Sequence, residues 1–238
     1  MPVAENIAQI REKIVAAAYR AGRNPRDIEL MAVTKTVSAD RIREAYEAGI
    51  HLFGENRVQE FESKMLARDG LPGACFHMIG HLQTNKASRA VELFDVIESV
   101  DSFRLARKID STAEQLGEKL PVLIEVNIGG EAAKNGVTPN SAELEELLTN
   151  AHSLPHLDFN GLMTVPPYND DPELSRPHFR RLRELAESIR QRRLPAVSMN
   201  VLSMGMSHDF EIAIQEGATR VRIGTALFGE RSPMRSKT

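Results

Sequence analysis

The first twenty or so residues carry apolar side chains at the spacing of an amphipathic helix. The stripe consists of Ile7, Ile10, Ile14 and Ala17. Gly22 and Pro25 follow it, and these residue types are typical of a helix end. The pattern therefore predicts an N-terminal helix over residues 3 to about 22.

After this helix, short apolar runs typical of buried strands alternate with amphipathic stretches. The predicted strands are residues 29–34, 50–53, 75–79, 94–98, 121–127, 157–163, 198–202 and 219–223. The predicted helices are residues 39–48, 56–67, 85–92, 102–117, 141–152, 172–192 and 207–216, with a last short one after Gly229. Such alternation predicts parallel strands joined by right-handed crossovers.

Eight strand–helix units in 238 residues predict an α/β fold, a single (β/α)8 TIM barrel with an additional N-terminal helix. We expect one domain over residues 1–238, with the N-terminal helix in 1–25, the barrel in 29–229 and a tail in 230–238. A doubly wound open sheet is the alternative fold.

Several helix ends carry local signals. Asn140 followed by Glu143 resembles a capping box, which predicts a helix start. Gly49, Gly117 and Gly217 stand where a helix commonly ends in a left-handed residue.

Composition narrows the classes of partner and compartment. The net charge of −3 and the pI near 6.2 favour neither nucleic acid nor an acidic membrane as a partner. Cys75 is the single cysteine, so an intramolecular disulfide is excluded and a reducing compartment is expected. No apolar run reaches the ~18 residues of a membrane helix. With Glu5 and Arg11 near its start, the chain does not resemble a signal peptide, and we expect a cytoplasmic protein.

Lys35 directly follows the first predicted strand, at the barrel end where enzymes of this fold keep their chemistry. It is either a surface charge or a reactive amine. A lysine forms a Schiff base only after it loses its proton, and burial or a nearby cation favours that loss. Arg222 on the last predicted strand is the candidate cation, because the first and last strands are neighbours in a closed barrel.

Two small, hydroxyl-bearing turns follow the last two predicted strands, in residues 202–207 and 221–225. Barrels often bind phosphate there. Ser203 and Gly205 belong to the first turn, and Gly224 and Thr225 belong to the second. Each turn alone is compatible with an ordinary tight turn. Together with Lys35 they favour a phosphorylated aldehyde as the ligand.

Arg222 and Asn56 each have two interpretations. Arg222 lies within an apolar strand, so it either pairs with a carboxylate such as Glu55 or Glu125 or faces a ligand. Asn56 follows the second strand, where it either reaches a ligand or caps the next helix.

The segment His77–Lys86 contains two histidines four residues apart, His77 and His81. The segment predicts a strand followed by a turn rather than a helix, and no carboxylate stands at a fitting spacing. We therefore predict no metal site.

Seven segments, in this order, resemble the pyridoxal phosphate homeostasis protein family, whose members resemble the N-terminal barrel of alanine racemase, the type III pyridoxal 5′-phosphate (PLP) fold. The resemblance covers nearly the whole chain. The segments are residues 33–36, 53–60, 79–86, 126–128, 161–164, 202–207 and 221–229.

The resemblance implies a set of cofactor-binding residues and no catalytic residue. Lys35 would carry PLP as a Schiff base, Arg222 would face the pyridine nitrogen, which would then stay unprotonated, and Asn56 would line the ring. The phosphate would be held by Ser203, Gly224 and Thr225 with backbone around Met204. Lys134 is an alternative amine or a solvent-exposed lysine.

The implied function is PLP binding in intracellular PLP (vitamin B6) homeostasis, without strong catalytic turnover, with PLP-dependent apo-enzymes as acceptors. The alternative is a PLP-dependent amino-acid racemase, and a lysine Schiff-base aldolase is a third. A racemase needs a second base, which racemases resembling this fold take from an added domain of a partner subunit. The chain ends about ten residues after Gly229, so we expect no such domain, leaving Tyr168 as the only candidate. We therefore favour the carrier, and we expect a monomer.

Overall fold

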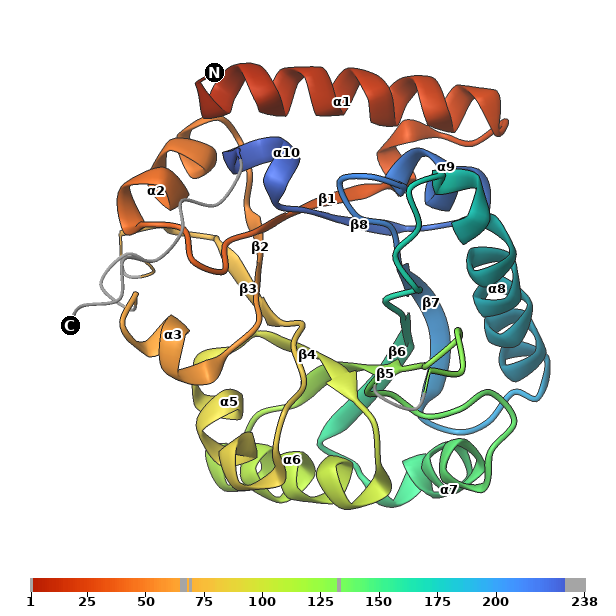
Figure 1. Ribbon diagram of the computed structural model, residues 1–238. Helices are drawn as coiled ribbons and strands as arrows, with labels where there is room; N and C mark the ends of the chain where they lie inside the picture. Colours follow the sequence, from red (N-terminus) through yellow and green to blue (C-terminus); the bar gives the residue numbers. More distant parts are fainter. Residues whose placement is uncertain (1, 65–67, 69, 132–133, 230–238) are drawn as a thin grey trace.

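The computed structural model describes residues 2–64, 68, 70–131 and 134–229. Eight parallel strands form a closed barrel in sequence order, and β1 pairs with β8 through Glu29↔Arg220 and Met31↔Arg222 (Figure 1). This closure confirms the predicted barrel and excludes the open sheet. The strands are β1 (Glu29–Val33), β2 (Leu52–Glu55), β3 (Cys75–Met78), β4 (Val96–Val100), β5 (Leu120–Glu125), β6 (Leu157–Met163), β7 (Val197–Ser203) and β8 (Arg220–Ile223).

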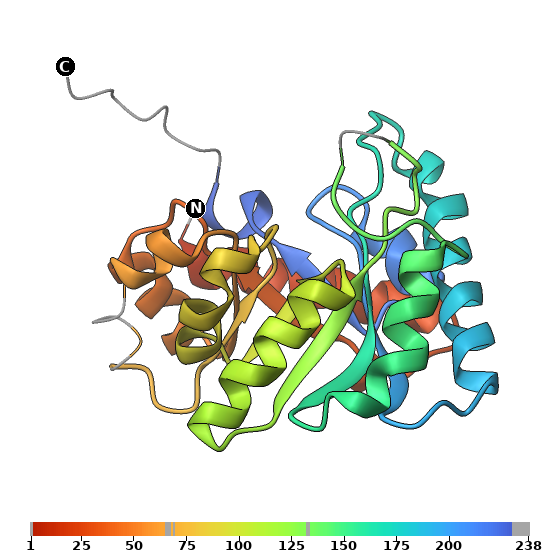
Figure 2. The ribbon, with the colours of Figure 1, turned by 90° about the horizontal axis from the view of Figure 1, so that it is seen from below.

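Helices surround the barrel, and the side view shows them running alongside the strands (Figure 2). They are α1 (Val3–Arg20), α2 (Ala39–Glu47), α3 (Val58–Glu62), α5 (Ala87–Leu93), α6 (Phe103–Leu116), α7 (Ala142–Asn150), α8 (Arg176–Gln191), α9 (Phe210–Gln215) and α10 (Thr225–Phe228). Among the helices in the described ranges, none has the length and apolar character needed to cross a membrane.

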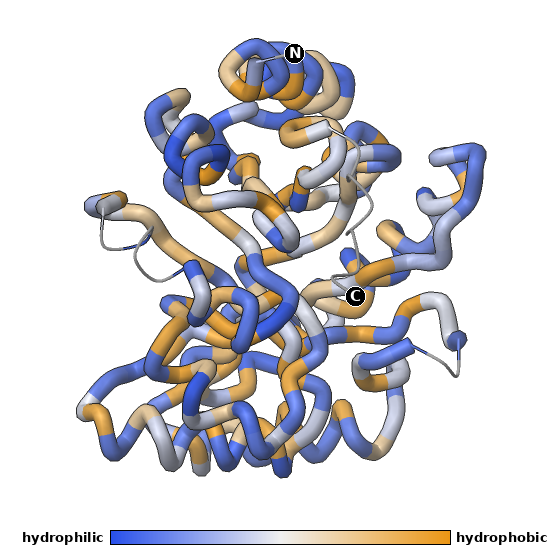
Figure 3. Tube along the Cα trace, turned by 60° about the vertical axis from the view of Figure 1, so that its left-hand side comes forward, coloured by the Kyte–Doolittle hydropathy of each residue, from blue (hydrophilic) through white to orange (hydrophobic). Residues whose placement is uncertain are grey.

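Helix α1 lies beside β1 and β8 and packs on α9 and α10 (Figure 1). Its predicted apolar stripe is buried, while polar residues such as Glu12 and Lys13 are exposed, so both kinds alternate along it (Figure 3). Asn6 Nδ2 donates to Leu227 O at 2.8 Å, and Arg20 pairs with Glu211 at 2.5 Å. The added helix therefore braces the last strand–helix unit, which supplies part of the pocket described below.

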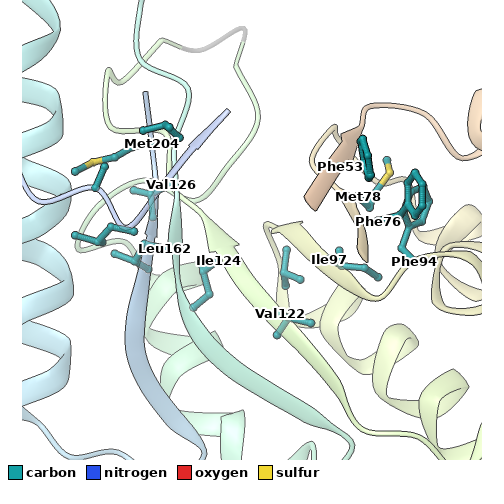
Figure 4. Close-up of a cluster of buried hydrophobic side chains, with 14 of the residues drawn as sticks. Phe53, Phe76, Met78, Phe94, Ile97, Val122, Ile124, Val126, Leu162 and Met204 are labelled. Atoms are coloured by element: carbon teal, nitrogen blue, oxygen red, sulfur yellow. The ribbon is translucent and has the colours of Figure 1, made fainter. Parts of the chain in front are cut away.

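A continuous apolar core, here called the helix-facing layer, lies between the strands and the helices. Phe53 and Phe76 are stacked at 5.1 Å between ring centroids (Figure 4). Phe61 packs on both Phe76 and Phe94. Each fully buried large apolar side chain contributes about 1.5–3 kcal/mol to folding. This layer is therefore the main source of the stability of the barrel.

The glycine signals at helix ends are confirmed, because Gly49, Gly117 and Gly217 have φ values of 85°, 69° and 106°. The capping-box prediction is wrong by one residue. Ser141 is the N-cap of α7, and its hydroxyl accepts from Leu144 N at 3.2 Å. Asn140 precedes it with φ 59° and forms part of the turn.

The last short helix, α10, lies before Gly229 rather than after it. It begins at Thr225, immediately after Gly224, and its apolar Leu227 is buried. The predicted tail, residues 230–238, lies outside the described residues.

Candidate functional site

A pocket of about 980 Å³ opens at the carboxyl ends of the strands. Segments that directly follow β1, β2, β3, β6, β7 and β8 form its walls, together with α2 and α10. The pocket brings together five of the seven predicted site residues, which are Lys35, Asn56, Arg222, Gly224 and Thr225. Ser203 and Met204 lie beneath it and are fully buried.

Lys35 is half-buried in a tight turn closed by a bond from Val37 N to Thr34 O of 2.9 Å. Thr36, at the third position of the turn, has φ 61°. That position of such a turn normally takes glycine or asparagine, and a β-branched residue there is strained. Strain of this kind persists only where the surroundings hold it, so the turn that carries Lys35 is held in one conformation.

Helix α3 and Lys64, which follows it, hold this turn. Glu60 accepts from Thr36 N, and Lys64 Nζ donates to Thr34 O at 2.8 Å. Lys64 Nζ also contacts Glu55 Oε1 at 2.9 Å and Glu60 Oε1 at 2.8 Å. These three acceptors match the three N–H groups of an ammonium, so Lys64 keeps no lone pair for a carbonyl carbon. The neighbouring Lys64 is therefore a structural amine.

The buried guanidinium of Arg222 lines the pocket and does not form a direct ion pair among the described residues. Its Nη1 donates to Ser203 O at 2.6 Å and to Ser203 Oγ at 2.8 Å, and its Nη2 donates to Thr164 O at 2.6 Å. Burial lowers the pKa of Arg222, and the charges of Glu98 and Glu125 partly offset that effect. Neither of the suggested pairs, with Glu55 or with Glu125, is formed, and Arg222 instead faces the ligand space.

Ser203 does not line the pocket. Its hydroxyl forms hydrogen bonds inside the barrel instead. Ser203 Oγ lies 2.5 Å from Glu98 Oε2, and Met204 N donates to Arg220 O at 3.1 Å. Met206 and Ser207, further along the same turn, line the pocket instead. Alternation along β7 could have predicted this, since an inward side chain near the end of a strand enters the lumen rather than the mouth.

The turn after β7 is joined to the turn after β8. Ser207 Oγ accepts from Ala226 N at 3.2 Å, so the two predicted phosphate turns meet as one wall. Gly205 permits this packing, because its φ is 92° and a Cβ there would lie 2.5 Å from Ala213 Cβ. The prediction that both turns serve one site therefore has a geometric basis.

The lining of the pocket is cationic. Lys35, Arg41 and Arg222 contribute to it, and its described lining residues include no carboxylate. Arg41 of α2 packs over the Phe228 ring at 5.9 Å, and its buried Nε has no partner among the described residues. Sequence reasoning missed Arg41, since a cation on an amphipathic helix is normally a solvated residue.

Asn56 also reaches the pocket, and its buried Oδ1 has no hydrogen-bond partner among the described residues. It does not cap the next helix, whose N-cap is Arg57. The pocket contains an amine, several cations, two hydroxyl-bearing turns and an amide oxygen without a partner among the described residues. This set suits a compact anion that carries an aldehyde and a ring with hydrogen-bond donors and acceptors. The residues present therefore fit PLP.

Tyr168 lines the pocket and is 74% exposed, with its ring 5.5 Å from that of His208. Tyr19 and Tyr46 lie on α1 and α2 and do not line it. Lys134 pairs with Glu131 outside the pocket lining.

The two histidines considered as metal ligands have carboxylate partners. His77 Nδ1 lies 2.6 Å from Glu98, and His81 Nδ1 lies 3.3 Å from Asp101. Within the described ranges, no group of three or more potential ligands is placed to hold a metal ion.

Comparison with known proteins finds similarity over almost the whole chain. Residues 5–232 match the family described as alanine racemase, N-terminal domain. A protein of Aquifex aeolicus named pyridoxal phosphate homeostasis protein is 46% identical over 231 residues, covering 97% of this chain and 99% of its own. The Escherichia coli protein of the same name is 41% identical, covering 96% and 97%.

Solved structures show the same similarity. PipY of Synechococcus elongatus, solved with PLP bound, is 37% identical with a TM-score of 0.82, covering 95% of this chain and 100% of its own. Alanine racemase of Clostridium difficile is 16% identical with a TM-score of 0.74, covering 98% of this chain and 58% of its own. The latter similarity shows the shared barrel alone.

Proposed function

The chain belongs to the alanine racemase N-terminal domain family and, within it, to the pyridoxal phosphate homeostasis proteins, and from this premise we propose that it binds PLP in intracellular vitamin B6 homeostasis. PLP is attached to Lys35 as a Schiff base. When bound, PLP supplies an aldehyde for an amine and a ring that accepts electrons.

One observation carries this proposal: Lys35 and the two joined turns line a single pocket that lacks carboxylates among its described residues. A phosphate dianion gains from several cations and has no like charge to oppose it there. Ser207 and Thr225 provide hydroxyls, and Gly224 lies between Arg222 and Thr225 on the same wall. In this assignment Ser207 takes the contact expected of Ser203. Asn56 lines the ring.

Borohydride reduction of the PLP-loaded protein, followed by peptide mass mapping, tests the attachment. We expect the label on Lys35, and the Lys35→Ala variant to lose the visible absorbance band. Lys134→Ala is the control, because it removes an amine outside the pocket lining. A main label on Lys134 in the wild-type protein would contradict the assignment.

We further propose that the protein is a monomeric, cytoplasmic PLP carrier that transfers PLP to apo-enzymes. An exposed mouth supports transfer, because Thr225 and Tyr168 at the pocket are accessible to a large partner. Mixing the loaded protein with a PLP-dependent apo-enzyme should restore activity faster than spontaneous PLP release does. Equal rates would contradict direct transfer.

Amino-acid racemisation is the second candidate, and the presence of Tyr168 at the pocket favours it. Two features oppose it. Tyr168 is 74% exposed, and Arg222 rather than a carboxylate occupies the pocket wall where ring-nitrogen chemistry is expected.

Incubation with L-alanine in deuterium oxide separates the two functions. Deuterium at Cα with retained configuration would indicate one base and agree with a carrier. Sustained D-alanine formation at ~1–1,000 per second, the usual range of enzymes, would establish a racemase. Tyr168→Phe would then abolish it.

A further inference from the structure

A buried polar network occupies the barrel lumen beneath the pocket. Glu98 of β4 is fully buried, and its Oε1 lies 2.6 Å from His77 Nδ1 and 2.7 Å from Arg220 Nη1. Arg220 also contacts Glu29 Oε2 through its Nη2 at 2.6 Å. The side chain of Glu29 is 55% exposed, so the network runs from solvent at the amino end of β1 into the barrel.

Ser203 connects this network to the pocket. Its Oγ lies 2.5 Å from Glu98 Oε2 and 2.8 Å from Arg222 Nη1. Burial alone would raise the pKa of Glu98, but the hydrogen bond from His77 and the charge of Arg220 hold that pKa well below its usual range. An ionised carboxylate only accepts, so Ser203 donates its single hydroxyl proton to Glu98 and must accept from Arg222.

The direction of these bonds limits what Arg222 offers to a ligand. A guanidinium has five N–H donors in a rigid planar arrangement. Three of the donors are used by Ser203 O, Ser203 Oγ and Thr164 O. Two have no acceptor among the residues that the structure describes, one on Nε and one on Nη2, and Arg222 lines the pocket.

We propose that Glu98 and Ser203 are positioning residues, which hold Arg222 so that its remaining donors select a ligand ring carrying an acceptor nitrogen. This inference rests on the proposed PLP binding. Neither residue lines the pocket, and both act through the guanidinium of Arg222. Without the Ser203 hydroxyl, Nη1 loses one of its two acceptors, and the planar group is held by two backbone carbonyls instead of by three acceptors. The selectivity for the ring nitrogen then falls.

The test compares two ligands that share the aldehyde and the phosphate, PLP and 1-deazapyridoxal 5′-phosphate, whose ring has C–H in place of the nitrogen. Equilibrium affinities are measured by titration of the apo-protein. The wild-type protein should bind PLP about tenfold to a hundredfold more tightly, because the analogue leaves a charged donor unpaired. In Ser203→Ala this preference should fall to about threefold or less, mainly through weaker PLP binding.

Ser99→Ala is the matched control. Ser99 is the neighbour of Glu98 on β4, is fully buried, and its Oγ has no partner among the described residues. The substitution deletes the same atom in the same barrel and should leave the preference unchanged. Glu98→Gln tests the network one step further from the ligand and should reduce the preference in the same direction.

The outcomes distinguish a failure of the positioning role from a failure of PLP binding. An intact PLP preference in folded Ser203→Ala overturns the positioning role while leaving PLP binding in place. Equal loss in Ser203→Ala and Ser99→Ala also overturns it, because that result reflects a general disturbance of the barrel. If the wild-type protein binds neither ligand, the proposed function itself fails. Should Ser203→Ala not fold, an unchanged preference in Glu98→Gln overturns the role.

Discussion

The two faces of the barrel wall differ in chemistry. Phe76, Ile97 and Val221 belong to the helix-facing layer. Side chains alternate along a strand, so His77, next to Phe76, and Glu98, next to Ile97, point into the lumen. These two residues belong to the lumen network. Apolar packing therefore surrounds a buried charged interior in a wall that is one residue thick.

The difference indicates a division of labour. The helix-facing layer contributes stability through area removed from water, and many apolar side chains of similar volume would serve there. In the lumen the buried charges of Glu98 and Arg220 compensate each other, since an uncompensated buried charge is costly. The lumen thus orients Arg222, while the helix-facing layer keeps the wall in place.

The largest effect is expected in the helix-facing layer. Phe76→Ala removes a side chain that is 1% exposed and stacks on Phe53. The free energy of unfolding should fall by about 3–5 kcal/mol, measured by denaturant titration. PLP affinity of the remaining folded protein should stay within about threefold.

Tyr19→Ala on α1 serves as the control, because Tyr19 is 70% exposed and its removal should change stability by less than about 0.5 kcal/mol. A strong loss of PLP affinity in folded Phe76→Ala would contradict the division of labour.

Periodicity predicted the helix-facing layer well, because that layer depends only on which residues are apolar and at what spacing. The stripe of α1 and the closure of β1 on β8 followed from it. Helix bounds shifted by one to several residues. The start of α7 at Ser141 rather than Asn140 depends on which side chain reaches Leu144 N, and spacing does not determine that.

The lining of the pocket was predicted in part. Lys35, Asn56, Arg222, Gly224 and Thr225 line the pocket as residues that directly follow or end strands, which the strand pattern locates. Ser203 was assigned by its hydroxyl, but its partner Glu98 is 105 residues away in the chain. Pairings across the lumen depend on how strands face each other, and one sequence contains no direct record of that.

A second prediction concerns the carboxylate at the centre of the lumen. Glu98→Gln keeps the shape but removes the charge opposite Arg220, and the free energy of unfolding at pH 7 should fall by about 2–3 kcal/mol. The folded pKa of Glu98 lies well below the unfolded value of about 4.3. The stabilisation is thus present above that unfolded value and is lost as the pH falls toward the folded one.

Denaturant titrations of both proteins at pH 7 and at pH 3.5 measure this difference, which should be smaller at the lower pH. A difference that grows on acidification would mean that the charge of Glu98 does not stabilise the fold.

The smallest effect has the opposite sign and concerns Glu125, also on the lumen side of the wall because its neighbours Ile124 and Val126 belong to the helix-facing layer. Burial and the nearby charge of Asp101 raise the pKa of Glu125 to about 7, although Arg222 opposes the shift, and its Oε2 has no partner among the described residues. In the unfolded chain the same carboxyl ionises near pH 4.3. The folded state therefore holds a proton that the unfolded state releases, and stability is lost as the pH rises from about 4.3 to about 7.

Glu125→Gln removes this cost and should raise the free energy of unfolding at pH 8 by about 1–3 kcal/mol, with little change at pH 4. Thermal unfolding at both pH values measures it, and a variant destabilised at pH 8, and less so at pH 4, would show that Glu125 is a paired carboxylate, as Glu98 is.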